Sequence, residues 1–183
     1  MWDEIFGHFH LTFIGYFLLT RSGQILPTLT VAQEDDTQFD FYLKTTTGDS
    51  YSFEIKYTED DFGTTTVEGH HEKWINIYKD KVDKLTGKDK VSEEDFFANY
   101  QLWRNIIFTI ERNHYTCFLY PKFRNDDLSE SVKKIMDKCK SLDKNKVIII
   151  NADDFVEKIL NSPDFSEKLK NHYKIFSEKY LEI

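Results

Sequence analysis

Two short segments in which apolar and polar residues alternate constrain the fold of this chain more than any other feature. The first runs over Phe39–Lys44 and the second over Tyr51–Tyr57, and a stretch of Thr, Gly, Asp and Ser residues separates them. Alternation with a period of two predicts β-strands, and the polar stretch between them predicts the turn of a hairpin. The strands share one core if their apolar side chains face the same way, namely Phe39, Phe41, Leu43, Phe53, Ile55 and Tyr57.

The same alternation places the polar side chains of the hairpin on its opposite face. Asp40 belongs to the first strand, and Glu54 and Lys56 belong to the second. A register symmetric about Thr47 sets Asp40 opposite Glu54, with Cβ atoms roughly 4.5–5.5 Å apart. We therefore predict an odd register offset at the turn, or a bulge that restores it, because an even loop would split both the acidic pair and the apolar set between the two faces.

Two opposed carboxylates repel each other unless a positive group lies between them. One solution is a divalent cation, Mg²⁺ or Mn²⁺, for which oxygen ligands are typical. Lys56 would then orient or deprotonate the attacking water and stabilise the phosphate in the transition state, which is the chemistry of phosphodiester hydrolysis. The other solution is an exposed sheet face on which Lys56 simply neutralises the two acids. The spacing alone leaves both explanations open.

The periodicity of the remaining chain predicts a mixed β-sheet covered by helices. The further strands are predicted over Leu26–Ala32, Tyr115–Tyr120 and Lys146–Asn151. Residues 2–20 fit an amphipathic helix or a pair of strands, and the helix is favoured. Further helices are predicted from Trp74 to Leu85, from a cap at Ser92 to Ile110, over Leu128–Leu142, and twice at the end of the chain, the second beginning at Ser162-Pro163. Because no repeat and no flexible linker interrupts the pattern, we expect a single domain over residues 1–183.

The formal net charge of −8 is unevenly distributed along the chain. Residues 1–68 hold 3 Lys and Arg against 12 Asp and Glu, whereas residues 104–148 hold 10 against 6. One explanation is an acidic centre that collects cations beside a basic segment that neutralises phosphates, which predicts substrate contacts by Lys133, Lys134 and Lys138. The other explanation is a solvated surface with uneven charge.

Cysteine content and hydropathy indicate a soluble, cytoplasmic protein. Cys117 and Cys139 are too few for a disulfide framework and lack the spacing of a metal site, so we expect both to be inert. The longest apolar stretch, Phe9–Leu19, falls short of the roughly 20 residues that span a bilayer. Asp3 and Glu4 stand where a secretory signal carries positive charge, so neither export nor a membrane partner is expected.

Five segments follow one another in an order that is fairly specific as a series, although the E-X-K triplet alone is a weak signal. They are Asp40-Phe41-Tyr42-Leu43, Phe53-Glu54-Ile55-Lys56-Tyr57-Thr58-Glu59, Phe62-Gly63, Tyr100-Gln101-Leu102-Trp103-Arg104-Asn105 and Phe118-Leu119-Tyr120-Pro121. The series resembles the PD-(D/E)XK nuclease superfamily, which has the restriction-endonuclease-like fold. More closely, about residues 25–150 resemble a group of uncharacterised bacterial restriction-endonuclease-like proteins.

This resemblance implies a role for each residue of the acidic hairpin. Asp40 and Glu54 would be metal ligands, and the main-chain carbonyl of Ile55 would supply another oxygen. Lys56 would be the catalytic lysine. Gln101 matches the glutamine that exonuclease-like branches carry on the helix after the E-X-K strand, and it would complete the catalytic set.

Other positions are expected to support this set or depart from the family pattern. Arg104, one helical turn from Gln101, would bind the scissile phosphate or form an ion pair with Glu59 or Glu54. Glu59 is expected in a supporting position, and Glu4 is the candidate for the acid that the family carries on its first helix. Two positions depart from the pattern: Phe39 replaces the proline of the motif name, and Asn105 replaces a tyrosine.

We therefore expect an α/β protein with a restriction-endonuclease-like mixed sheet flanked by helices, and a Mg²⁺-dependent nuclease that acts on DNA, with Mn²⁺ as a substitute. The alternative is a catalytically silent module that uses the same fold to bind nucleic acid or a protein. The intact set of Asp40, Glu54 and Lys56 favours the enzyme, whereas the short first helix and the acidic net charge favour the silent module. A homodimer is compatible with either.

Overall fold

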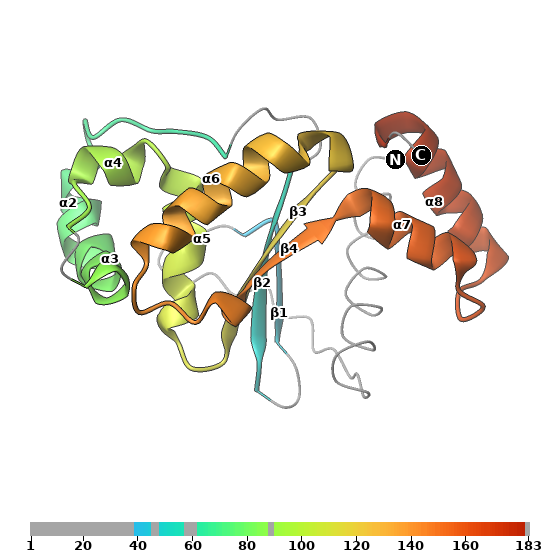
Figure 1. The fold of residues 1–183 in the computed structure, drawn as a ribbon, viewed down its shortest axis with the longest axis horizontal. Coiled ribbons are helices and arrows are strands. Elements are labelled where there is room, and N and C mark those ends of the chain that lie inside the picture. Colours follow the sequence, from blue (N-terminus) through green and yellow to red (C-terminus); the bar gives the residue numbers. More distant parts are fainter. Residues whose placement is uncertain (1–38, 45–47, 57–61, 88–89, 182–183) are drawn as a thin grey trace.

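The structure, a computed structural model, describes residues 39–44, 48–56, 62–87 and 90–181 (Figure 1). Its described part is built on a four-stranded sheet with the order β1-β2-β3-β4: β1 (Phe41–Lys44), β2 (Ser50–Ile55), β3 (His114–Tyr120) and β4 (Val147–Asn151). β1 is antiparallel to β2, and β2, β3 and β4 are parallel to one another. The predicted mixed sheet is therefore confirmed. The predicted helix over 2–20 and strand over Leu26–Ala32 lie outside the described residues.

The pairing of β1 with β2 has the register that the alternation predicts. Phe41 lies opposite Phe53 and Lys44 lies opposite Ser50, which is the register symmetric about Thr47. Continued by one residue past Phe41, this register would place Asp40 opposite Glu54. The prediction of an odd offset is therefore confirmed, because an even offset would have turned every side chain of one strand to the other face.

The parallel strands are joined by helical crossovers, because a tight turn can join only antiparallel strands. Between β2 and β3 the chain forms α2 (His71–Lys73), a π-helical turn (Trp74–Tyr78), α3 (Lys79–Thr86), α4 (Glu93–Phe97), α5 (Tyr100–Ile106) and a 3₁₀ turn (Ile107–Ile110). Between β3 and β4 it forms a 3₁₀ turn (Lys122–Arg124), α6 (Asn125–Lys138) and a second 3₁₀ turn (Lys144–Lys146). α7 (Ala152–Asn161) and α8 (Glu167–Tyr180) follow β4.

The helix predicted from Ser92 to Ile110 begins as expected but is broken in the middle. Ser92 is the N-cap of α4, and its hydroxyl accepts a hydrogen bond from the backbone N–H of Asp95 over 3.0 Å. The amide of Asn99 donates a hydrogen bond to the backbone carbonyl of Asp95 over 3.2 Å. In a continuous helix, the backbone N–H of Asn99 would donate to the Asp95 carbonyl. Because the Asn99 side chain takes this place, α4 ends and α5 starts in a new direction.

The predicted start of the last helix at Ser162-Pro163 is wrong. Ser162 instead follows the end of α7, where its backbone N–H donates to the carbonyls of Lys158 and Ile159. Its hydroxyl accepts a hydrogen bond from the N–H of Asp164, which forms a turn rather than a cap. The N-cap of α8 is Ser166, four residues later. A Ser-Pro pair thus ended one helix here instead of starting the next.

The sheet separates two apolar cores, one on each face. α3, α5 and α6 lie on one side of the sheet, and α7 and α8 lie on the other (Figure 1). The first core contains Trp74 and Trp103, and the second contains Phe53 and Cys117. Both faces of β2 and β3 are therefore covered, as is usual for parallel strands.

Burial on both faces corrects one expectation about the hairpin. Glu54 is only 3% exposed and Lys56 only 7% exposed, so their face of the sheet is not a solvated surface. The exposed sheet face that the alternative explanation required is therefore wrong for Glu54 and Lys56, although Lys56 does form an ion pair with Glu54. The reason is that α5 packs over this face, which the alternation of the strand could not show.

Two smaller observations concern reactivity and membrane association. Cys117 and Cys139 are both free and buried. Burial raises the pKa of Cys139 to about 12, so its side chain is a protonated thiol at neutral pH. Within the described ranges, no helix combines the length and the apolar character needed to cross a bilayer.

Candidate active site

The candidate site lies where β2 ends, beside the parallel strand β3. Glu54 and Ile55 are the last residues of β2, and Lys56 follows them directly. The backbone N–H of Lys56 donates to the carbonyl of Leu119 over 2.9 Å, so the chain remains tied to β3 past the end of the ladder. Ligand and catalytic sites of open parallel sheets occur at this carboxyl end of the strands.

Asp40 joins the site from the neighbouring strand. Its side chain is exposed, and its Oδ2 accepts a hydrogen bond from the backbone N–H of Ile55 over 2.7 Å. This contact holds the carboxylate of Asp40 against the residue that follows Glu54. The structure therefore brings together the two acids that the sequence predicted to be neighbours.

Glu54 and Lys56 form a buried ion pair. The Nζ of Lys56 lies 3.1 Å from Oε1 of Glu54, and both side chains are almost fully buried. Burial raises the pKa of Glu54 above its usual value, and the negative charge of Asp40 raises it further, whereas Lys56 and Asn105 act in the opposite direction. Burial and Asp40 thus favour the protonated form of Glu54, whereas Lys56 and Asn105 favour the carboxylate.

Helix α5 supplies two further side chains to Glu54. The amide nitrogen of Asn105 donates to Glu54 Oε2 over 3.0 Å, and the guanidinium Nη2 of Arg104 lies 3.8 Å from the same oxygen. Of the two ion-pair partners considered for Arg104, the structure shows Glu54, whereas Glu59 lies outside the described residues. The guanidinium also lies over the ring of Tyr100, 5.5 Å from its centroid. Its contact with phosphate remains a prediction.

Gln101 lies one turn earlier on α5, and its side chain packs against Gly63. A Cβ on Gly63 would come within 3.2 Å of the Gln101 side chain, which is closer than a normal contact, and the φ of +69° at Gly63 also favours glycine. The Oε1 of Gln101 is buried and has no hydrogen-bond partner among the described residues. No described contact joins the Gln101 side chain to Asp40 or Glu54, so its role in catalysis remains a prediction.

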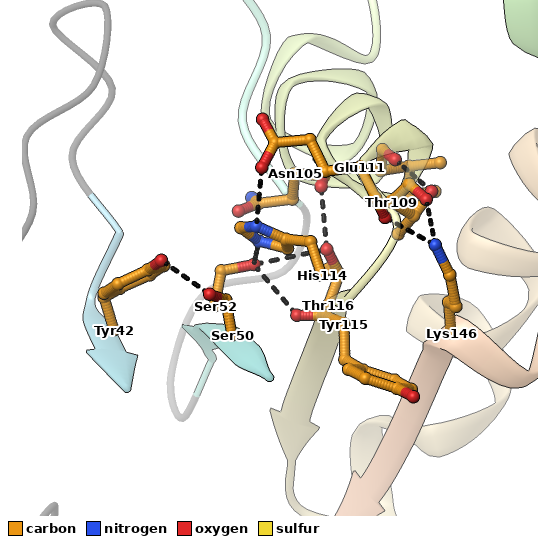
Figure 2. Close-up of polar contacts among 11 residues, drawn as sticks. Tyr42, Ser50, Ser52, Asn105, Thr109, Glu111, His114, Tyr115, Thr116 and Lys146 are labelled. Atoms are coloured by element: carbon orange, nitrogen blue, oxygen red, sulfur yellow. Dashed lines mark hydrogen bonds and ion pairs between the residues drawn. The ribbon is translucent and has the colours of Figure 1, made fainter. Parts of the chain in front are cut away.

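A polar network that was not predicted from the sequence lies beneath α5, on the face of the sheet that carries Glu54 and Lys56 (Figure 2). Ser52 Oγ lies 3.1 Å from His114 Nε2 and 3.2 Å from Thr116 Oγ1, and Thr116 donates to the backbone carbonyl of Asn105 over 2.8 Å. The sequence did contain a signal for Ser52. Because Ser52, Glu54 and Lys56 are two residues apart, they lie on the same face of the strand.

His114 is the titratable member of this network. Burial, with a smaller contribution from the charge of Lys146, lowers the pKa of His114 to about 4. The imidazole is therefore neutral at pH 7, and its 3.9 Å approach to Glu111 is no salt bridge at that pH. Lys146 itself donates to the backbone carbonyls of Thr109 and Glu111, which ties the start of β4 to the end of the α5 segment.

The remaining predicted residues are not brought to this cluster. Lys133, Lys134 and Lys138 are exposed on the outer face of α6, whose buried face packs into the first core. Lys134 forms an exposed ion pair with Glu130 over 2.8 Å. No described contact joins the three lysines to Glu54 or Lys56, so they remain predictions about a wider substrate surface. Glu59 and Glu4 lie outside the described residues.

The donor atoms at this site suit a hard divalent cation. Within the described ranges, no group of three or more His, Cys, Asp or Glu side chains could hold a metal ion. Mg²⁺, however, is commonly held by only one or two carboxylates together with water and substrate oxygens. Asp40, Glu54 and the carbonyl of Ile55 would provide such a set. Each carboxylate oxygen accepts two partners, so the contacts of Glu54 with Lys56 and Asn105 do not exhaust its capacity.

Comparison with known families identifies the family of this chain. A family model described as "Restriction Endonuclease associating with ARP" matches residues 28–181. The chain therefore belongs to this family, which by its name is a family of nucleases, and a restriction endonuclease implies a DNA substrate. Searches of curated proteins and of solved structures found no match.

Proposed function

We propose that this protein hydrolyses phosphodiester bonds in DNA with the help of Mg²⁺, on a PD-(D/E)XK type of fold. The observation that carries this proposal is the buried pair of Glu54 and Lys56 at the end of β2, with Asp40 held beside it by the N–H of Ile55. Asp40, Glu54 and the Ile55 carbonyl would hold the ion, and Mn²⁺ would substitute for it.

The arrangement of elements supports the same fold. An antiparallel hairpin carries the acidic pair, a helical crossover returns to the parallel strand β3, and α5 of that crossover brings Gln101, Arg104 and Asn105 to the carboxyl end of β2. This order matches the motif series of the superfamily: acid, then Glu-X-Lys, then a helix that bears glutamine. The match of the family model over residues 28–181 supports the assignment independently.

Each side chain of the site has a chemical role that its position allows. A bound divalent ion would supply positive charge that neutralises the two acids and polarises the scissile phosphate. Lys56 Nζ, held by Glu54, can donate a hydrogen bond to a phosphate oxygen or to the attacking water. Arg104 can stabilise charge on the phosphate, and the amide of Gln101 can orient it.

One specific observation favours the alternative, a silent module that binds nucleic acid or protein without cleaving it. Both oxygens of Glu54 already have partners within the chain, Lys56 on Oε1 and Asn105 on Oε2. An acid whose charge is balanced internally has less need of a cation. The two proposals differ in one measurable property, which is cleavage that depends on a divalent ion.

The test is cleavage of plasmid and linear DNA by the purified full chain with and without Mg²⁺. Asp40→Asn is the decisive variant, because Asp40 is exposed and asparagine retains an oxygen that can accept the hydrogen bond from Ile55. We expect Mg²⁺-dependent cleavage by the wild type and at least a hundredfold loss in Asp40→Asn, a loss on the scale of one essential electrostatic group. Asp80→Asn, at an exposed position on α3, is the control and should cleave normally. Equal cleavage by wild type and Asp40→Asn would contradict the proposed site, and DNA binding without any cleavage would favour the silent module.

A further inference from the structure

Asn105, on α5, donates a side-chain hydrogen bond to Glu54, the candidate metal ligand. The residue is fully buried, and its single amide nitrogen donates to Glu54 Oε2 over 3.0 Å and to the backbone carbonyl of Gln101 over 2.8 Å. Both hydrogens of the amide are therefore used, one within the helix and one across to β2. The side chain links the helix that carries Gln101 to the strand that carries Glu54.

The backbone of Asn105 is fixed from a third direction. Thr116, on β3, donates from its hydroxyl to the carbonyl of Asn105 over 2.8 Å. Ser52 lies 3.2 Å from the same hydroxyl and 3.1 Å from His114 Nε2, so Thr116 is itself held by buried polar neighbours (Figure 2). The position of Asn105 is thus determined by contacts with both β2 and β3.

The orientation of the amide follows from its partners. Glu54 Oε2 and the Gln101 carbonyl are both acceptors, so the amide must present its nitrogen to them. Its own Oδ1 is then buried without a hydrogen-bond partner among the described residues. An unpaired buried oxygen costs free energy, which an apolar side chain of similar size would avoid. Stability alone therefore does not explain an asparagine here.

We infer that Asn105 is a positioning residue that fixes the carboxylate of Glu54 for binding of the divalent ion, an inference that rests on the proposed function. With Oε2 held by Asn105, the carboxylate cannot rotate about its last bond without losing a buried hydrogen bond. The orientation of Oε1, which Lys56 contacts, is fixed at the same time. Groups that orient a ligating side chain in this way commonly change metal affinity or activity 10–100-fold when they are removed.

The experiment compares Mn²⁺ binding by isothermal titration calorimetry with cleavage kinetics in the full chain. Asn105→Leu removes the amide and keeps a similar volume. We expect a Kd for Mn²⁺ about 10–100-fold higher, together with a lower kcat and a KM for DNA that is nearly unchanged. Thr116→Val, which removes the anchor of the Asn105 carbonyl together with the contact to Ser52, should weaken Mn²⁺ binding in the same direction but by less.

Thr109→Val is the matched control. It removes a buried hydroxyl that donates to the Ile106 carbonyl over 2.6 Å in the same helical segment, without contact to Glu54. It should bind Mn²⁺ like the wild type. The inference fails if Asn105→Leu binds Mn²⁺ within twofold of the wild type, or if Thr109→Val loses as much affinity as Asn105→Leu. If Asn105→Leu does not fold, Thr116→Val decides in the same way. A wild type that binds no Mn²⁺ overturns the proposed function itself and the inference with it.

Discussion

The ammonium nitrogen of Lys56 lies 3.1 Å from Oε1 of Glu54, and neither side chain has more than 8% of its surface exposed. Two charges in such a place are costly to desolvate, and each depends on the other for compensation. The pair therefore links stability to the proposed chemistry, because the lysine that would act on phosphate also balances the acid that would bind the ion. The side chain of Asp40 is exposed, so replacing it leaves no buried charge without a partner.

Lys56→Ala is expected to destabilise the protein by about 3 kcal/mol, because it removes the nearest counter-ion of the buried Glu54 carboxylate and leaves only Arg104, at 3.8 Å. The free energy of unfolding in urea measures this. Lys134→Ala is the control, since its ion pair with Glu130 is exposed on both sides, and such pairs contribute less than about 1 kcal/mol. Similar losses in the two variants would mean that the burial of the Glu54–Lys56 pair has no energetic weight.

Gly63→Ala is expected to lower both stability and DNA cleavage. The positive φ of +69° alone should cost about 1–2 kcal/mol, and the new methyl group would also press on the side chain of Gln101. Gly87→Ala separates the two effects, because Gly87 has a φ of +66° with nothing within 4 Å of the added Cβ. Both variants should show a similar loss in thermal stability, whereas only Gly63→Ala should reduce kcat. A normal kcat in Gly63→Ala would argue against a role for Gln101 in catalysis.

Acidification should destabilise the protein through His114. Burial lowers the folded-state pKa of His114 to about 4, compared with 6.5 for the exposed group, so the unfolded chain binds more protons between these values. The contribution of neutral His114 to the free energy of unfolding is complete above pH 6.5 and is lost as the pH falls toward 4. The difference between the two pKa values corresponds to about 3 kcal/mol.

Urea unfolding at several pH values between 7 and 4 measures the contribution of His114 as the difference in slope between the wild type and His114→Gln. The variant should show a flatter loss of stability over this interval, whatever its stability at pH 7. Thr109→Val, a change in the same region that removes no titratable group, is the control and should keep the slope of the wild type. Parallel curves for wild type and His114→Gln would contradict the prediction.

Binding of DNA should tighten when a divalent ion is present. Without an ion, Asp40, Glu54 and the acidic residues near them repel phosphate, whereas a bound cation reverses the sign of the local charge. Ca²⁺ serves here as an ion that tests binding, and fluorescence anisotropy with a labelled duplex gives the affinity. We expect a lower Kd with Ca²⁺ in the wild type and a smaller change in Asp40→Asn.

The basic face of α6 gives a separate prediction about DNA. Replacing Lys133, Lys134 and Lys138 with Gln should weaken binding to all duplex sequences and flatten the dependence of affinity on salt, as expected for phosphate contacts. The same anisotropy titrations at several salt concentrations measure both effects. If affinity depends on neither these lysines nor Ca²⁺, the lysines are a solvated helix face, and a protein becomes the better candidate for the partner.

Local regularities of the sequence determined the central hairpin and its register. Period-2 alternation predicted the register of β1 with β2, and this register also brings Asp40 close to Glu54. The prediction that Phe39 shares the apolar face of Phe53 is wrong, because Phe39 packs against Phe108 in the first core whereas Phe53 lies in the second. The cap at Ser92 and the buried strand β3 were equally local features, because each depends on a few neighbouring residues. The Ser-Pro pair at 162–163 shows the limit of such signals, since the same residues can end one helix or start another.

Only the tertiary structure decided which surfaces are covered and which side chains meet across elements. The alternation of β2 shows that Glu54 and Lys56 share a face, but the burial of that face depends on α5, which is about fifty residues away along the chain. The hydrogen bond from Asn105 to Glu54 and the network through Thr116 arise from the same packing. Alternation acts through adjacent residues, whereas burial depends on the packing of segments far apart in the sequence. The proximity of the two acids was therefore readable from the sequence, and their environment was not.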